Sequence, residues 1–127
     1  GQIRPEMIVT LKKIKGNLIQ ACLTNNIQSM GDMDFEGNVS ASGKHEEVME
    51  LFDFVFESSK ENVRKPDPEF YIRACERGNV NPDEVVFLDD LGINLKPAKA
   101  LGMKTIKVVK PQEALLELNS YLEIDLN

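Results

Sequence analysis

The sequence VVFLDDLGIN, residues 85–94, carries the most information about the fold of this chain. Its four consecutive apolar residues, 85–88, are typical of a short strand buried on both faces, as in a parallel sheet. Asp89 and Asp90 end this run, and a loop with Gly92 and Asn94 follows. Open α/β sheets bind their ligands at the carboxyl ends of the strands. The stretch therefore predicts a parallel sheet with two carboxylates at its ligand-binding edge.

The adjacent carboxylates of Asp89 and Asp90 also indicate a chemistry. Two negative charges held side by side repel each other unless a cation or a proton lies between them. Oxygen ligands of this kind suit hard divalent cations. An Asp pair before a glycine can equally cap a helix or form a turn. Taken alone, the pair is compatible with a metal site and with local turn chemistry.

The segments around this stretch alternate between helices and strands. Apolar runs predict strands at residues 18–23, 54–56, 85–88 and 105–109. Helical spacing predicts helices at 5–15, 45–52, 68–77, from Asn94 to Gly102, and from Pro111 onward. Residues 31–43 are rich in Gly, Ser, Asp and Asn, which is typical of a loop. This alternation favours an α/β fold with a Rossmann-like, doubly wound parallel sheet and crossover helices.

Two of the expected helices have specific end signals. Asp67 should cap the helix that begins at Pro68, and this helix should bury Phe70, Ala74 and one of Tyr71 or Cys75. Asn94 should cap the next helix, which would place Pro97 in the first turn, where no intrahelical N–H bond is lost.

Composition limits the class of protein and its partners. The length of 127 residues suits one domain over residues 1–127, with 42% hydrophobic and 28% charged residues. The net charge of -6 argues against nucleic acid and membrane surfaces, because both attract basic faces. Two cysteines do not indicate a disulfide framework. We therefore expect an intracellular, reducing compartment, with the cytoplasm as the simplest assignment and the peroxisome and mitochondrion left open.

Three segments together resemble a known family. The sequences LTNN at 23–26, RKPDP at 64–68 and FLDDLGIN at 87–94 resemble, in order, motifs two, three and four of the haloacid dehalogenase superfamily. The flanking sequences RPEM at 4–7 and NLKPA at 94–98 look most like the phosphatase domain at the amino end of soluble epoxide hydrolase and its relative in acyl-CoA dehydrogenase family member ten. Three motifs in the correct order are far more specific than any one alone.

The resemblance implies a magnesium-dependent phosphatase that acts through an aspartyl-phosphate intermediate. It assigns Asp90 as the direct ligand of Mg²⁺ and Asp89 as a residue that holds the water shell of the metal. Asn94 matches a polar residue that orients this shell. Mg²⁺ suits the arrangement because it prefers oxygen ligands and keeps several waters.

The resemblance also assigns residues to a phosphorylated small-molecule substrate. Thr24 matches the hydroxyl that hydrogen-bonds the transferring phosphoryl group, and Asn25 beside it is a further donor. Lys65 matches the lysine that pairs with both phosphate and nucleophile. Because Lys65 precedes Pro66, its backbone is restricted to extended conformations, which limits the directions of its side chain.

The chain departs from the family at motif one. Family members carry an Asp-x-Asp nucleophile motif on a first, central strand, followed by a helical cap, and neither is recognisable here. Asp32 and Asp34 form an Asp-x-Asp sequence, but they lie in the predicted loop after residue 26, so we do not assign them as the nucleophile. We expect a truncated or alternatively spliced form that lacks turnover on its own.

A missing central strand would leave the backbone groups of its two neighbours without partners. The chain would then pair those strands directly, recruit another chain, such as a second copy of itself through the gap, or remain partly disordered. A functional alternative follows from the same gap: a non-catalytic binding or interaction module derived from this fold.

Overall fold

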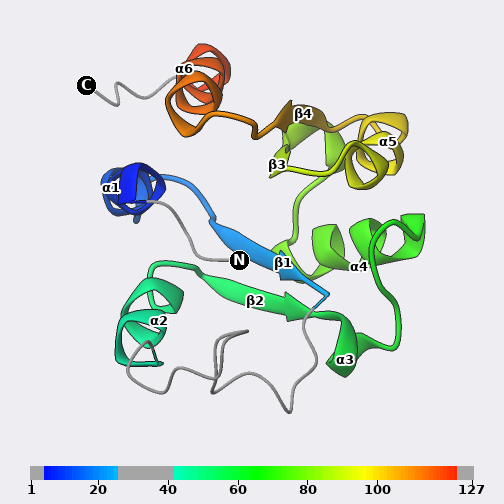
Figure 1. The fold of residues 1–127 in the computed structure, drawn as a ribbon. Coiled ribbons are helices and arrows are strands. Elements are labelled where there is room, and N and C mark those ends of the chain that lie inside the picture. The colour runs from blue at the N-terminus through cyan, green and yellow to red at the C-terminus, as the bar shows by residue number, and fades with distance from the viewer. Residues whose placement is uncertain (1–4, 26–41, 123–127) are drawn as a thin grey trace. The chain divides into compact units, whose positions relative to one another are not determined.

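The computed structural model describes residues 5–25 and 42–122 of the chain. These residues belong to two compact units that divide between Arg64 and Lys65. Each unit holds one two-stranded sheet with helices, as the labels of Figure 1 indicate. Both strand pairs are parallel. The predicted α/β class with parallel strands is therefore confirmed, while the expectation of one domain over residues 1–127 stays a prediction.

The first unit has a β-α-β arrangement preceded by a helix. Its strands β1 and β2 pair in parallel, with Ala21 opposite Phe54 and Thr24 opposite Glu57. The elements in chain order are α1 (Pro5–Ile14), β1 (Ala21–Thr24), α2 (Ser42–Met49), β2 (Phe54–Glu57) and α3 (Ser58–Glu61).

Strand β1 is shorter than the predicted run of residues 18–23, because Gln20 has another role. The side-chain amide of Gln20 donates to the carbonyls of Leu11 and Leu51 at 3.0 and 3.1 Å. Its backbone N–H donates to Asp53 Oδ2 at 2.7 Å. Gln20 is 8% exposed, so these bonds satisfy a buried polar group. The regular strand begins only at the next residue, Ala21.

The second unit contains the motif stretch. Its strands β3 and β4 pair in parallel, with Val86 opposite Lys104 and Asp89 opposite Lys107. The elements are α4 (Pro68–Gly78), the 3₁₀ turn η3 (Pro82–Glu84), β3 (Val86–Asp89), α5 (Gly92–Ala100), β4 (Lys104–Lys107) and α6 (Pro111–Tyr121).

Helix α4 begins as the sequence predicts. Asp67 is its N-cap, and the Asp67 carboxylate accepts the backbone N–H of Glu69 at 2.9 Å. The helix buries Phe70, Ala74 and both of the residues between which the pattern left a choice, Tyr71 and Cys75. The buried face is therefore wider than the pattern indicated.

The prediction that Asn94 caps the next helix is wrong. Helix α5 begins at Gly92, its N-cap is Leu91, and no side chain caps it. Asn94 therefore lies inside the first turn, and Pro97 lies beyond it, where its missing N–H removes one internal hydrogen bond. The predicted end is confirmed: Gly102 adopts φ +106°, a conformation that glycine tolerates without strain.

The remaining boundaries shift by a few residues. Strand β4 begins and ends earlier than the predicted run of residues 105–109, and α2 lies three residues before the predicted helix at 45–52. The predicted loop at 31–43 overlaps α2 at residues 42 and 43, and the rest of it lies outside the described residues. Within 5–25 and 42–122, no helix is long and apolar enough to cross a membrane.

The core of the second unit contains side chains from every one of its long elements. Its most completely buried residues are Phe70, Tyr71, Ala98 and Ile106, each 0% exposed. The ring of Tyr71 meets those of Phe70 and Phe87 edge to face, at centroid distances of 5.9 and 5.4 Å. Such aromatic pairs add stability beyond the area that they bury.

Replacing Ile106 with Ala should lower the free energy of unfolding by about 2–5 kcal/mol, because a fully buried side chain leaves a cavity. The matched control is Val109→Ala, at a position 71% exposed, which should change this free energy by less than about 0.5 kcal/mol. Urea unfolding followed by circular dichroism measures both. Equal effects of the two variants would contradict the assignment of Ile106 to the core.

Candidate functional site

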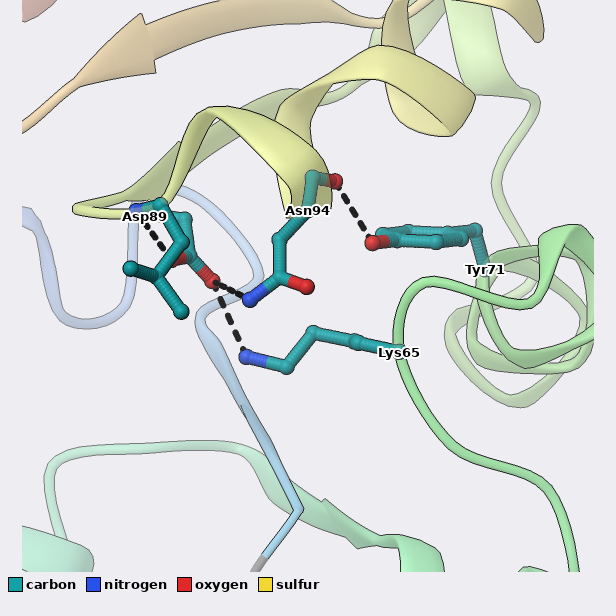
Figure 2. Close-up of polar contacts among 5 residues, drawn as sticks. Lys65, Tyr71, Asp89 and Asn94 are labelled. Atoms are coloured by element: carbon teal, nitrogen blue, oxygen red, sulfur yellow. Dashed lines mark hydrogen bonds and ion pairs between the residues drawn. The ribbon is translucent and has the colours of Figure 1, made fainter.

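A buried ion pair lies at the carboxyl end of β3. Lys65 Nζ is 3.0 Å from Asp89 Oδ2, and the two side chains are only 11% and 8% exposed. Figure 2 shows Lys65 reaching from the segment before α4 to the end of the strand. Lysine and aspartate are almost never buried to this degree unless they are paired. The structure therefore brings together two residues that the sequence assigned to one site.

An aromatic ring also helps to place the ammonium group of Lys65. Its Nζ lies 5.8 Å from the centroid of the Phe87 ring, within the range of a cation–π interaction. Phe87 and Asp89 are two residues apart on β3, so their side chains leave the same face of the strand. The positive charge is thus held between an aromatic ring and a carboxylate.

The carboxylate of Asp89 accepts three hydrogen bonds. Its Oδ1 accepts the backbone N–H of Leu91 at 2.9 Å. Its Oδ2 accepts from Lys65 Nζ at 3.0 Å and from Asn94 Nδ2 at 3.3 Å. Burial acts to raise the pKa of Asp89, but the Leu91 N–H and the Lys65 ammonium outweigh it and hold this pKa below its usual range. Asp89 is therefore ionised at neutral pH.

Asn94 holds its place in the site from within helix α5. It is 6% exposed, and its side chain points at Asp89, while its backbone carbonyl accepts the hydroxyl of Tyr71 (Figure 2). Burial, followed by the charge of Asp89, raises the pKa of Tyr71 to about 12, so the hydroxyl keeps its proton and remains a donor. The structure thus joins Asn94 to the ion pair, while its predicted role in orienting the metal's water shell stays a prediction.

Tyr71 and Phe87 contact this group of residues, and the sequence pattern assigned neither of them to the site. The helical pattern indicated only that either Tyr71 or Cys75 is buried. The available signal was the residue type, because a buried tyrosine usually finds a hydrogen-bond partner for its hydroxyl, whereas phenylalanine needs none.

Asp90 differs from Asp89 in its surroundings. Its side chain is exposed at the start of the loop between β3 and α5, whereas both oxygens of Asp89 are engaged by nearby donors. This donor set fits the predicted division of roles, with Asp90 as the ligand that a cation from solution can reach. The described segments contain no group of three His, Cys, Asp or Glu residues suited to a metal. Mg²⁺ sites in proteins usually combine one or two carboxylates with several waters.

Thr24 and Asn25 belong to the first unit. Thr24 is the last residue of β1 and Asn25 follows it, so both stand at the carboxyl end of a parallel strand, as predicted. Both side chains are half-buried. Their convergence with Lys65 and Asp89 on one edge stays a prediction.

Replacing Asp89 with Asn should destabilise the chain by about 1.5–3 kcal/mol at pH 7, the range for hydrogen bonds to charged groups. Because the folded pKa of Asp89 lies below the unfolded one, the contribution of its charge is complete well above pH 4 and is lost as the pH falls through the folded value. The free energy of unfolding should therefore fall less steeply below pH 4 in Asp89→Asn than in the wild type.

Asp83→Asn is the matched control, because it removes an exposed carboxylate from the turn η3. This variant should keep the wild-type slope. Urea unfolding series between pH 2 and pH 7 measure the slopes, and identical slopes for wild type and Asp89→Asn would contradict the ion-pair assignment.

Curated proteins are similar in sequence to this chain over most of its length. Acyl-CoA dehydrogenase family member 10 of Mus musculus is 37% identical over 124 residues, covering 97% of this chain and 11% of the relative. Bifunctional epoxide hydrolase 2 of Sus scrofa is 37% identical over 123 residues, covering 91% of this chain and 22% of the relative. Sesquiterpene phosphatase astK of Aspergillus oryzae is 31% identical over 125 residues, covering 93% of this chain and 58% of the relative. The chain thus spans less than two thirds of each of these relatives.

A solved structure is also similar to this chain. A crystal structure described as a dehalogenase is 26% identical, with a TM-score of 0.74, and the match covers 98% of this chain and 58% of that one. The family model of the haloacid dehalogenase-like hydrolases matches residues 1–102, a span that includes all three recognised motifs. The chain belongs to the haloacid dehalogenase-like hydrolase family.

Proposed function

We propose that this chain carries the metal- and phosphate-binding residues of a magnesium-dependent phosphatase that acts on a phosphorylated small molecule. The observation that carries the proposal is the buried ion pair of Lys65 and Asp89 at the end of β3. It places a fixed positive charge and a fixed negative charge at the edge of a parallel sheet, where α/β folds bind their ligands. The phosphatase among the relatives supports the same class of reaction.

Lys65 is the phosphate-binding residue of this proposal. An ammonium group offers three donors and a compact charge, both suited to the oxygens of a phosphate. Asp89 and the Phe87 ring fix where this charge lies before a substrate arrives. A charge held in advance needs no rearrangement when negative charge develops during phosphoryl transfer. Thr24 and Asn25 would add donors if the carboxyl ends of β1 and β3 share an edge.

Asp90 is the residue that would hold Mg²⁺ directly, and Asp89 and Asn94 would contact the water molecules bound to the metal. Asp89 is already held by three donors, so it suits contacts to water on the metal better than direct ligation. When bound, the cation offsets the negative charge of the phosphate. Outer residues of this kind orient a metal site and tune its affinity.

The nucleophile is not assigned to any residue of this sequence. Asp32 and Asp34 form its one Asp-x-Asp sequence, and both lie outside the described residues. We therefore expect binding of cation and phosphate without turnover by these 127 residues alone. The net charge of -6 argues against nucleic acid and membrane surfaces, whereas a small anion can still bind at a local positive site such as Lys65. Association of two copies is compatible with the proposal.

Mg²⁺ added to ¹⁵N-labelled chain should shift the amide resonances of residues 89–94. Asp90→Asn should weaken this binding about 10-fold or more, because it removes the charge of the proposed ligand. Asp83→Asn should bind as the wild type does, since that carboxylate lies in η3. An equal loss of affinity in both variants would show that general surface charge, and no defined site, attracts the cation.

With p-nitrophenyl phosphate and Mg²⁺, the chain should show no turnover above the uncatalysed rate. Inorganic phosphate should still bind, and Lys65→Met should weaken this binding about 10-fold, because it keeps the apolar stem but removes a charge-assisted contact. Phosphate titrations followed by NMR measure the affinity. Turnover that Asp90→Asn abolishes would contradict the expected inactivity and reveal a recruited nucleophile. Absence of both Mg²⁺ and phosphate binding would favour a non-catalytic module.

A further inference from the structure

The ring of Tyr71 is fixed by aromatic neighbours on two elements. It packs edge to face against Phe70 of α4 and against Phe87 of β3, and it is 0% exposed. Phe87 lies two residues before Asp89 on the same face of the strand. The position of the ring is therefore set by the strand that carries the ion pair, as well as by its own helix.

The hydroxyl of Tyr71 leaves this packed ring toward helix α5. It donates to the backbone carbonyl of Asn94, which lies in the first turn of that helix (Figure 2). From the same residue, the side-chain amide donates to Asp89 Oδ2 at 3.3 Å. Asn94 thus accepts a hydrogen bond from the buried Tyr71 hydroxyl and donates another to the Asp89 carboxylate of the ion pair.

The first turn of α5 is held locally by backbone donors: the Asn94 N–H donates to the Leu91 carbonyl at 3.0 Å, and the Leu91 N–H donates to Asp89 Oδ1 at 2.9 Å. No side chain caps the helix, and Pro97 cannot donate the N–H that a helix residue normally supplies at its position. Leu91 and Ile93, on either side of its first residue, are 53% and 65% exposed. Asn94 is the buried residue of this turn, so its backbone bond to Tyr71 attaches the turn to the core.

We propose that Tyr71 is a positioning residue, which acts through Asn94 to hold the Asn94 amide on Asp89 and so to fix the outer shell of the cation site. The effect on cation binding rests on the proposed function, whereas the effect of the Tyr71 hydrogen bond on the position of Asn94 does not. The ring contacts of Tyr71 need only a phenyl group, so they do not account for a tyrosine. A buried hydroxyl is costly unless it is paired, and the carbonyl of Asn94 provides its partner.

Tyr71→Phe tests the proposal, because it keeps the ring and removes only the hydroxyl. The side-chain amide protons of Asn94 should shift in ¹H–¹⁵N spectra and exchange with solvent several-fold faster than in the wild type. Affinity for Mg²⁺ alone should fall about 10-fold, the low end of the range for residues behind a metal ligand. Tyr121→Phe makes the same change on a tyrosine of α6 that is 40% exposed, and it should alter neither measurement.

A double-mutant cycle separates positioning from general destabilisation. In an Asn94→Ala background the amide is gone, so adding Tyr71→Phe should produce no further loss of Mg²⁺ affinity. Independent, multiplicative losses would overturn the proposal. An unchanged Asn94 amide resonance in Tyr71→Phe would also overturn it.

Two results keep the test separate from the proposed function. If the wild-type chain binds no Mg²⁺, the proposed function loses its metal site, while the Asn94 resonance still decides the role of Tyr71. If Tyr71→Phe does not fold, hydrogen exchange in the wild-type chain tests the role of Tyr71, because its hydroxyl proton should be protected from exchange with solvent. Rapid exchange of that proton would refute the hydrogen bond on which the inference depends.

Discussion

The desolvation of two opposite charges, Lys65 and Asp89, is the constraint around which the second unit is arranged. Taking either charge out of water alone costs several kcal/mol, so each depends on the other and on further hydrogen bonds. The backbone N–H of Leu91 and the amide of Asn94 supply those bonds to Asp89. The segment before α4, the end of β3 and the first turn of α5 must therefore keep their relative positions for the pair to persist.

This constraint explains why two adjacent aspartates are not equivalent. Asp89 is the last residue of β3, and its side chain turns inward among three donors. Asp90 is the next residue, beyond the strand, and its side chain is exposed. One carboxylate is therefore held by the donors around it, and the other is open to solvent. The proposed division of metal-binding roles rests on this difference in exposure and hydrogen bonding.

Asn94 donates and accepts hydrogen bonds, as the sequence pattern assumed, but it does not cap helix α5. Asparagine is a strong N-cap residue, and the sequence pattern used it as one. In the folded chain its amide instead serves Asp89, five residues earlier, and the helix starts at Gly92 without a side-chain cap. A contact across a turn prevailed because it satisfies a buried charge, which is worth more than satisfying an exposed helix end.

The sequence by itself determined the alternation of helices and strands, the cap at Asp67, the helix end at Gly102 and the family. These features depend on apolar periodicity, backbone preferences of single residues and short motifs, all of which act over a few neighbours. Only the tertiary structure decided that Lys65 pairs with Asp89 across 24 residues and that Tyr71 joins them through Asn94. Such partners are set by which side chains are buried together, and no local pattern encodes that.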